Sequence, residues 1–133
     1  MTQKKVLTDE LFAVFCAEIA NDKKAEDVVT IKVKNVSLIA DYFIVCTGKS
    51  TPHINAIAEG IRRKAREKYN IRPYAIDGKS ESQWIVLDFG AVMVHVLSDE
   101  ARMKYQLETL WNDAEKMEKF LSGKTRKNEE EEI

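Results

Sequence analysis

Three consecutive residues, Gly48-Lys49-Ser50, are of the types that bind phosphate in many nucleotide-binding proteins. They stand between an apolar run typical of a strand and a segment with helical spacing, where backbone N–H groups and the helix dipole can hold an anion. A complete Walker loop also needs a glycine five positions before Gly48, and that position is Phe43. The pattern therefore favours a tight turn before a capped helix. A nucleotide-binding or nucleotidyltransferase-type enzyme using this turn is the alternative.

Carboxylates and histidines do not form a recognisable catalytic set. Two-metal nucleotidyl transfer needs converging carboxylates, yet no Asp-x-Asp pair occurs, and Asp77 and Asp88 fall on different predicted elements. His95 alternates with valines in a strand, where a lone histidine is more often hydrogen-bonded structure than a catalytic base. His53 follows Pro52 at a helix start, and no Ser/His/Asp or Cys/His spacing is present. The sequence predicts no catalytic residue, metal ligand or cofactor, and hence no enzyme.

Composition describes a globular chain of one-domain size. The 133 residues are 44% hydrophobic and 32% charged, without an apolar run near the ~18–20 residues that a membrane span requires. The N-terminus does not resemble a signal peptide, and Cys16 and Cys46 lie in apolar surroundings, so we expect a cytoplasmic protein with two buried thiols. The net charge of -1 argues against extensive binding to a nucleic-acid backbone.

Hydrophobic spacing predicts helices and strands in an alternating order. Thr8 is a suitable cap for a first helix, Thr51 and Pro52 would begin a second one, and Asp77-Gly78 would form a turn. The predicted elements are a helix after Thr8, strands at 28–33 and 42–47, a helix from Pro52 to Tyr69-Asn70, strands at 72–76, 84–88 and 91–97, and a helix from Ser98 or Asp99 through Leu110-Trp111.

This order predicts an α/β fold in one domain. The strand–helix–strand unit from Tyr42 to Ile76 implies a parallel crossover, and the strands separated only by Phe89-Gly90 imply an antiparallel hairpin. The result is a mixed β-sheet of about five strands flanked by α-helices. We expect the domain to span residues 1–122 and the polar, acidic residues 123–133 to form a disordered tail.

Aromatic and charged residues gather in the last third of the chain. Helical spacing places Arg102, Tyr105 and Glu108 on one side of the final predicted helix, and Trp84 opens the hairpin. Aromatic residues beside charges are typical of protein interfaces. The alternative is that Trp84 and Tyr105 merely complete the core.

Several segments resemble the ribosomal silencing factors, the Iojap-related family. The last is the most specific, because six residue types coincide at fixed spacing. The segments are Ala40-Asp41-Tyr42-Phe43-Ile44-Val45 with Gly48-x-Ser50, Trp84-Ile85-Val86-Leu87-Asp88-Phe89-Gly90, Val94-His95-Val96, and Arg102-x-x-Tyr105-x-Leu107-Glu108-x-Leu110-Trp111.

The resemblance implies a nucleotidyltransferase-like topology without the catalytic carboxylates. It also implies binding to the large ribosomal subunit through ribosomal large-subunit protein fourteen, which would block association with the small subunit and repress translation. The residues matching the family's contact positions are Trp84, Asp88, Tyr105 and Glu108, with Arg102 as a further candidate. The chain departs from the family where Ala91 replaces a frequent aspartate.

Two further expectations concern partners. Five basic residues on the predicted helix from Pro52 to Tyr69 could touch ribosomal RNA, although such residues usually form a solvated face, so we expect this contact to be minor or absent. An exposed apolar contact face would also let the protein form a C2 homodimer away from the ribosome.

Overall fold

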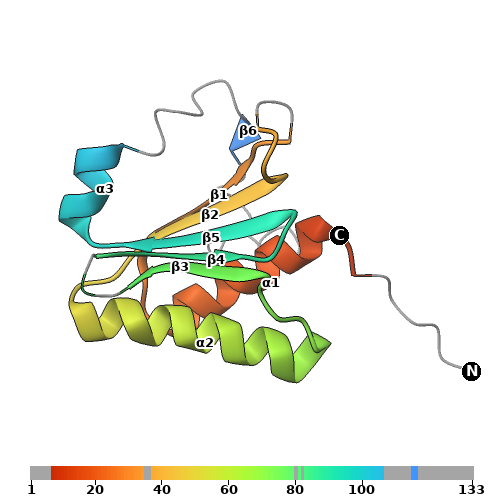
Figure 1. The fold of residues 1–133 in the computed structure, drawn as a ribbon, viewed down its shortest axis with the longest axis horizontal. Coiled ribbons are helices and arrows are strands. Elements are labelled where there is room, and N and C mark those ends of the chain that lie inside the picture. Colours follow the sequence, from red (N-terminus) through yellow and green to blue (C-terminus); the bar gives the residue numbers. More distant parts are fainter. Residues whose placement is uncertain (1–6, 35–36, 80, 82, 107–114, 117–133) are drawn as a thin grey trace, which may run out of the picture.

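The protein folds as a mixed sheet with two helices on one face and a short third helix on the other (Figure 1). A computed structural model describes residues 7–34, 37–79, 81, 83–106 and 115–116. The elements are α1 (Asp9–Asp22), β1 (Glu26–Lys32), β2 (Tyr42–Thr47), α2 (Thr51–Tyr69), β3 (Ala75–Lys79), β4 (Trp84–Asp88), β5 (Val92–Leu97), α3 (Asp99–Tyr105) and β6 (Glu115–Lys116).

Each long helix begins at a side-chain cap. The Thr8 hydroxyl accepts a hydrogen bond from Leu11 N at 3.1 Å, which confirms the predicted start of α1. In α2 the cap is Ser50, whose Oγ accepts from His53 N at 3.2 Å, so the predicted cap at Thr51 was one residue late. Both residue types cap well, and the backbone of Ser50 is the one in the extended conformation that capping requires.

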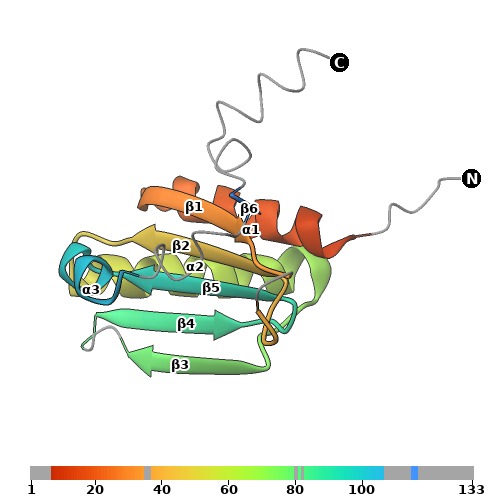
Figure 2. The same cartoon turned by 90° about the horizontal axis from the view of Figure 1, so that it is seen from above.

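The strand order is β3-β4-β5-β2-β1-β6 (Figure 2). The predicted hairpin is confirmed, because β4 pairs antiparallel with β5 and Trp84 lies opposite Leu97. β2 pairs parallel with β5 rather than with β3. After β2 the chain passes through α2 to β3 at the edge of the sheet, and β4 and β5 lie between β3 and β2. The two-residue β6 adds a sixth strand to the five that we expected.

β3 corrects one prediction. Residues 72–74 precede the strand, and Asp77 and Gly78 lie inside it rather than in a turn. Gly78 has φ +83°, and a Cβ atom there would meet the Trp84 carbonyl oxygen at 2.1 Å. Glycine at this position therefore permits close approach of β4, which a sequence pattern cannot distinguish from a turn.

The two faces of the sheet carry separate apolar clusters. Tyr42, Ile44 and Cys46 pack toward α1 and α2, as expected for a strand buried on both faces. Phe43 and Val45 point to the opposite face and join a second cluster. α3 lies at one end of this second face and contributes Ala101 (Figure 2).

α3 is shorter than the helix that we predicted. It ends at Tyr105, because Gln106 adopts the left-handed conformation, with φ 47°, and donates its N–H to the Arg102 carbonyl. The predicted helix to Leu110-Trp111 is therefore interrupted at Gln106. Glu108 and residues 107–114 lie outside the described residues, as do the proposed domain boundary after residue 122 and the tail 123–133.

Candidate functional site

Two backbone N–H groups of the turn at Gly48-Lys49-Ser50 already donate within the chain. Gly48 N donates to the Leu97 carbonyl at 2.9 Å, and Lys49 N donates to His53 Nδ1 at 2.9 Å. The Lys49 ammonium lies 3.2 Å from a Glu26 carboxylate oxygen. A phosphate would have to break these interactions, so the turn is built as a closed connection rather than an open anion loop.

The hollow beside this turn is also unsuited to an anion. It has a volume of about 340 Å³ and is lined by Ser98, Asp99 and Glu100 as well as by the turn. Gly48 is required here for packing, since a Cβ atom would lie 2.7 Å from Ile54 Cγ1. The nucleotide-binding alternative therefore gains no support from the local geometry.

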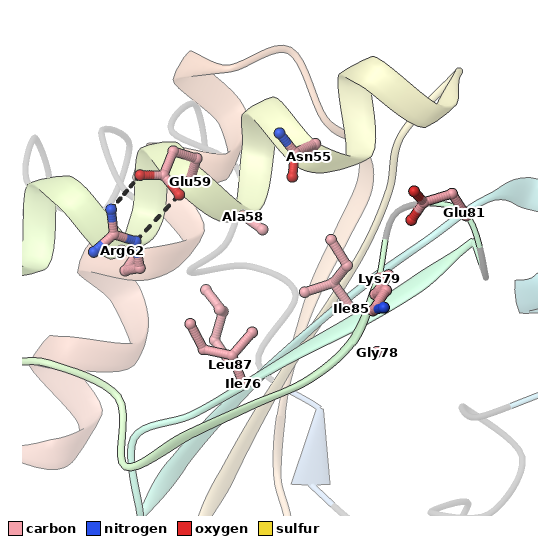
Figure 3. Close-up of a pocket in the computed structure, with 10 residues that line it drawn as sticks. All are labelled: Asn55, Ala58, Glu59, Arg62, Ile76, Gly78, Lys79, Glu81, Ile85 and Leu87. Carbon is pink, nitrogen blue, oxygen red and sulfur yellow. Dashed lines mark hydrogen bonds and ion pairs between the residues drawn. The ribbon is translucent and has the colours of Figure 1, made fainter.

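A second hollow, of about 330 Å³, lies between α2 and the β3–β4 hairpin (Figure 3). Ile76, Ile85 and Leu87 line its apolar side, and the Glu59–Arg62 ion pair lines its helix side. The Glu59 carboxylate and the Arg62 guanidinium pair with each other, and Lys79 and Glu81 line the hollow as well, so the charges of these four side chains balance.

Other chemistry is limited in the described part of the chain. Among the described residues, no three His, Cys, Asp or Glu side chains lie where they could share a metal ion. Both predicted thiols are buried, and burial raises the pKa of Cys16 far above its usual range and that of Cys46 to about 12, so neither is a ready nucleophile. Within the described residues, no helix has the length and apolar character to cross a bilayer.

The structure brings two of the predicted contact residues together. The rings of Trp84, at the start of β4, and Tyr105, at the end of α3, have centroids 4.8 Å apart. Trp84 is partly buried on the second face, whereas Tyr105 is 47% exposed. An exposed tyrosine packed against a partly buried tryptophan is the kind of aromatic anchor that dominates protein interfaces.

The relative position of these two rings is fixed by the residues just before them. Ser98, the cap of α3, donates its N–H to the Gln83 carbonyl at 3.0 Å, and its hydroxyl donates to Gln83 Oε1 at 2.8 Å. Gln83 directly precedes Trp84, so the start of α3 is tied to the start of β4. The aromatic pair is therefore presented by a rigid corner of the fold.

Arg102 also fixes α3 to the sheet. Its Nη1 donates to the Asp27 carbonyl at 2.8 Å and to Thr47 Oγ1 at 3.0 Å. These bonds join the helix to β1 and β2. Part of the guanidinium is thus committed within the chain, which gives Arg102 a positioning role beside Tyr105.

Asp88 lies at the opposite end of β4 from Trp84. The two residues are four positions apart along the strand, or about 13 Å, and strand alternation places both on the second face. Asp88 Oδ1 accepts from Gly90 N at 2.8 Å, and Gly90 has φ +95°. The Asp-x-Gly motif therefore builds the turn of the hairpin, and the second carboxylate oxygen is the part left for a partner.

One contributor was not among the predicted contact residues. His95, on β5, accepts a hydrogen bond at Nδ1 from the Trp84 indole N–H at 3.2 Å. The sequence indicated a hydrogen-bonded structural histidine, which is confirmed, but not its partner. In the hairpin register Trp84 lies opposite Leu97, so Trp84 and His95 are two positions apart on the same face of the sheet. A prediction of this register would have indicated that the two side chains are in contact.

Comparison with known proteins decides the family. The family described as "Ribosomal silencing factor during starvation" matches residues 8–133. This chain belongs to the ribosomal silencing factor family. A protein named ribosomal silencing factor RsfS from Bacillus subtilis is 39% identical over 114 residues, which cover 86% of this chain and 91% of the relative.

The family extends to organelles and to solved structures. The Iojap-related mitochondrial protein of Arabidopsis thaliana is 33% identical over 99 residues, which cover 71% of this chain and 53% of that protein. A crystal structure from Bacillus halodurans superposes with a TM-score of 0.70 and 34% identity, covering 84% of this chain and 99% of that one. The predicted family and α/β fold are thus confirmed, and the family's description is that of a ribosome-associated regulator of translation rather than an enzyme.

Proposed function

We propose that this protein binds the large ribosomal subunit through ribosomal large-subunit protein fourteen and sterically prevents the small subunit from joining. Such a protein represses translation by occupancy and needs no active site. It would act in the cytoplasm, where subunits join. Family membership supports the ribosomal role, and the aromatic pair formed by Trp84 and Tyr105 is the single observation that carries the choice of surface.

The contact surface that we propose runs along the second face of β4. It starts at Tyr105 and Trp84, continues over Val86 and ends at Asp88, because residues two apart on a strand share a face. The aromatic end would supply the anchor. Asp88 would supply a charge for a basic group on the partner, and Glu108 stays a predicted contact outside the described residues.

The expected energies show why the aromatic end should dominate. Truncating a well-packed aromatic anchor costs ~2 kcal/mol or more, which is about a thirtyfold loss of affinity. An exposed ion pair at the rim contributes under about 1 kcal/mol. We therefore expect binding to depend on Trp84 and Tyr105 more strongly than on Asp88.

Direct RNA binding should contribute little. On α2, Arg62 is paired with Glu59, and the Lys64 ammonium lies 3.9 Å from a Glu67 carboxylate oxygen. This basic face is partly neutralised by its own acidic residues. Affinity for large subunits should therefore change little with salt, whereas many phosphate contacts would make it fall steeply.

Co-sedimentation with isolated large subunits tests the proposed surface. The wild-type protein should pellet with the subunits, and a variant carrying Trp84→Ala and Tyr105→Ala should stay in the supernatant. Leu11→Ala is the matched control, because Leu11 is an exposed apolar residue on α1, across the sheet from the proposed surface. Thermal unfolding of each variant establishes that it is folded.

The single variant Tyr105→Ala guards against loss of structure, since this ring is largely exposed and Trp84 belongs to the second apolar cluster. Binding of a folded double variant at wild-type strength would exclude the Trp84–Tyr105 end as the contact.

We also propose that the same surface is available for a C2 homodimer off the ribosome. Light scattering of the wild type and of Tyr105→Ala would then report different masses.

A further inference from the structure

Four aromatic rings form a continuous series from solvent to the buried sheet. Tyr105 contacts Trp84 at a centroid distance of 4.8 Å, Trp84 contacts His95 at 6.0 Å, and His95 contacts Phe43 at 4.8 Å. Exposure falls along the series, from 47% at Tyr105 to 6% at His95 and 3% at Phe43. A buried ring, that of His95, therefore adjoins the partly buried Trp84 against which the exposed Tyr105 packs.

The hydrogen bond between Trp84 and His95 has only one polarity. An indole N–H can donate but cannot accept, so His95 Nδ1 must be the acceptor and the ring proton must be on Nε2. A doubly protonated imidazole has no acceptor and would break this bond. Burial lowers the pKa of His95 to about 4, so the accepting form is the one present at neutral pH.

We propose that His95 is a positioning residue for partner binding: its Nδ1 holds the Trp84 indole in the orientation against which Tyr105 packs. The sheet fixes the imidazole itself, because residue 95 lies between Val45 of β2 and Val86 of β4, and the Phe43 ring packs against it. His95 need not touch the partner. The proposal rests on the proposed function only for its effect on binding.

A stabilising role alone does not account for a histidine at this place. His95 Nε2 is buried and has no hydrogen-bond partner among the described residues. A buried donor without an acceptor costs free energy, so an apolar side chain would serve the core as well or better. The one hydrogen bond that the His95 ring makes to another described residue is the bond that Nδ1 accepts from the Trp84 indole.

The matched variants are His95→Asn and His95→Leu. Their side chains have the same number of heavy atoms and the same branching, so both leave the same space beside Phe43. Asn retains an acceptor oxygen close to the position of Nδ1, and Leu does not. We expect His95→Leu to release the indole and to weaken binding to isolated large subunits by roughly tenfold, the worth of one net hydrogen bond. His95→Asn should largely retain both the hydrogen bond to the indole and the affinity for large subunits.

Two readouts separate the inference from the proposed function. In the free protein, ¹⁵N–¹H NMR of the Trp84 indole reports its hydrogen bond, and long-range ¹⁵N spectra of the wild type report which nitrogen of His95 carries the proton. A protonated Nδ1 in the wild type, or an indole signal that His95→Leu leaves in place, overturns the positioning role. The wild-type measurement of the His95 proton stands even when a variant fails to fold.

Binding to large subunits is then measured with the same samples. Equal affinities of His95→Leu and His95→Asn, with the indole displaced only in the former, would show that the orientation of Trp84 does not matter for binding and would overturn the proposal. A wild-type protein that binds no large subunit would instead refute the proposed function. The indole signals would then still decide whether His95 positions Trp84.

Discussion

The pH dependence of stability tests the environment assigned to His95. Burial lowers its pKa from about 6.5 to about 4 in the folded protein. Between these values the unfolded chain binds a proton that the folded protein does not, so stability falls as pH decreases through this window. From pH 7 to pH 5 this one group should remove about 2 kcal/mol from the free energy of unfolding.

The assay is urea unfolding of the wild type and of His95→Asn at pH 7 and pH 5. Carboxylates titrate in both proteins, so the difference between the two pH-dependent losses isolates the histidine. We expect the loss to be about 2 kcal/mol smaller in His95→Asn. Identical losses in the two proteins would refute the buried, neutral histidine on which the ring series depends.

Three further predictions concern a turn, a strand and the phosphate alternative. Asp88→Asn should keep the hydrogen bond to Gly90 N and the fold, but it should bind large subunits slightly less tightly than the wild type. Asp88→Ala loses that hydrogen bond and should also unfold at a lower urea concentration. Equal binding by the wild type and both variants would remove Asp88 from the contact. Gly78→Ala should lower the free energy of unfolding by about 2 kcal/mol or more, because the added methyl meets the Trp84 carbonyl, and unchanged stability would contradict the close approach. Calorimetry with ATP and Mg²⁺ should give no heat of binding, and tight binding lost in Lys49→Ala would restore the enzyme alternative.

Much of the fold follows from local patterns in the sequence. The strand at Tyr42–Thr47 is apolar throughout because both of its faces are covered, and such a run is hard to mistake. The apolar stripe of α2 and the hairpin of β4 and β5 are equally direct, since helical spacing and a short connection each allow few structures.

The errors arose where one residue type serves two structures. Gly78 has the same positive φ in β3 that it would have in a turn, so the Asp-Gly pair predicted the wrong element. Gln106 ends α3 in a left-handed conformation. Glycine or asparagine at this position would have predicted the end of the helix, but glutamine does not. The cap at Ser50 rather than Thr51 depends on backbone geometry, because both hydroxyls are suitable.

The residues of the candidate site could be proposed from the sequence, but their arrangement could not. Family resemblance selected Trp84 and Tyr105, and the structure places their rings in contact. Asp88 lies at the far end of β4, and its Oδ1 accepts a hydrogen bond from Gly90 N in the turn. Residue spacing in the sequence does not predict this bond. The role of His95 depends on a contact across two strands, and such contacts require the register as well as the sequence.

Subunit joining is the most direct measurement of the central claim. Purified small and large subunits are mixed under conditions that favour association, with the wild-type protein or with Tyr105→Ala, and are separated on a sucrose gradient. The wild type should leave the subunits apart while it migrates with the large one, and Tyr105→Ala should let them join. Full association in the presence of saturating wild-type protein would contradict the account.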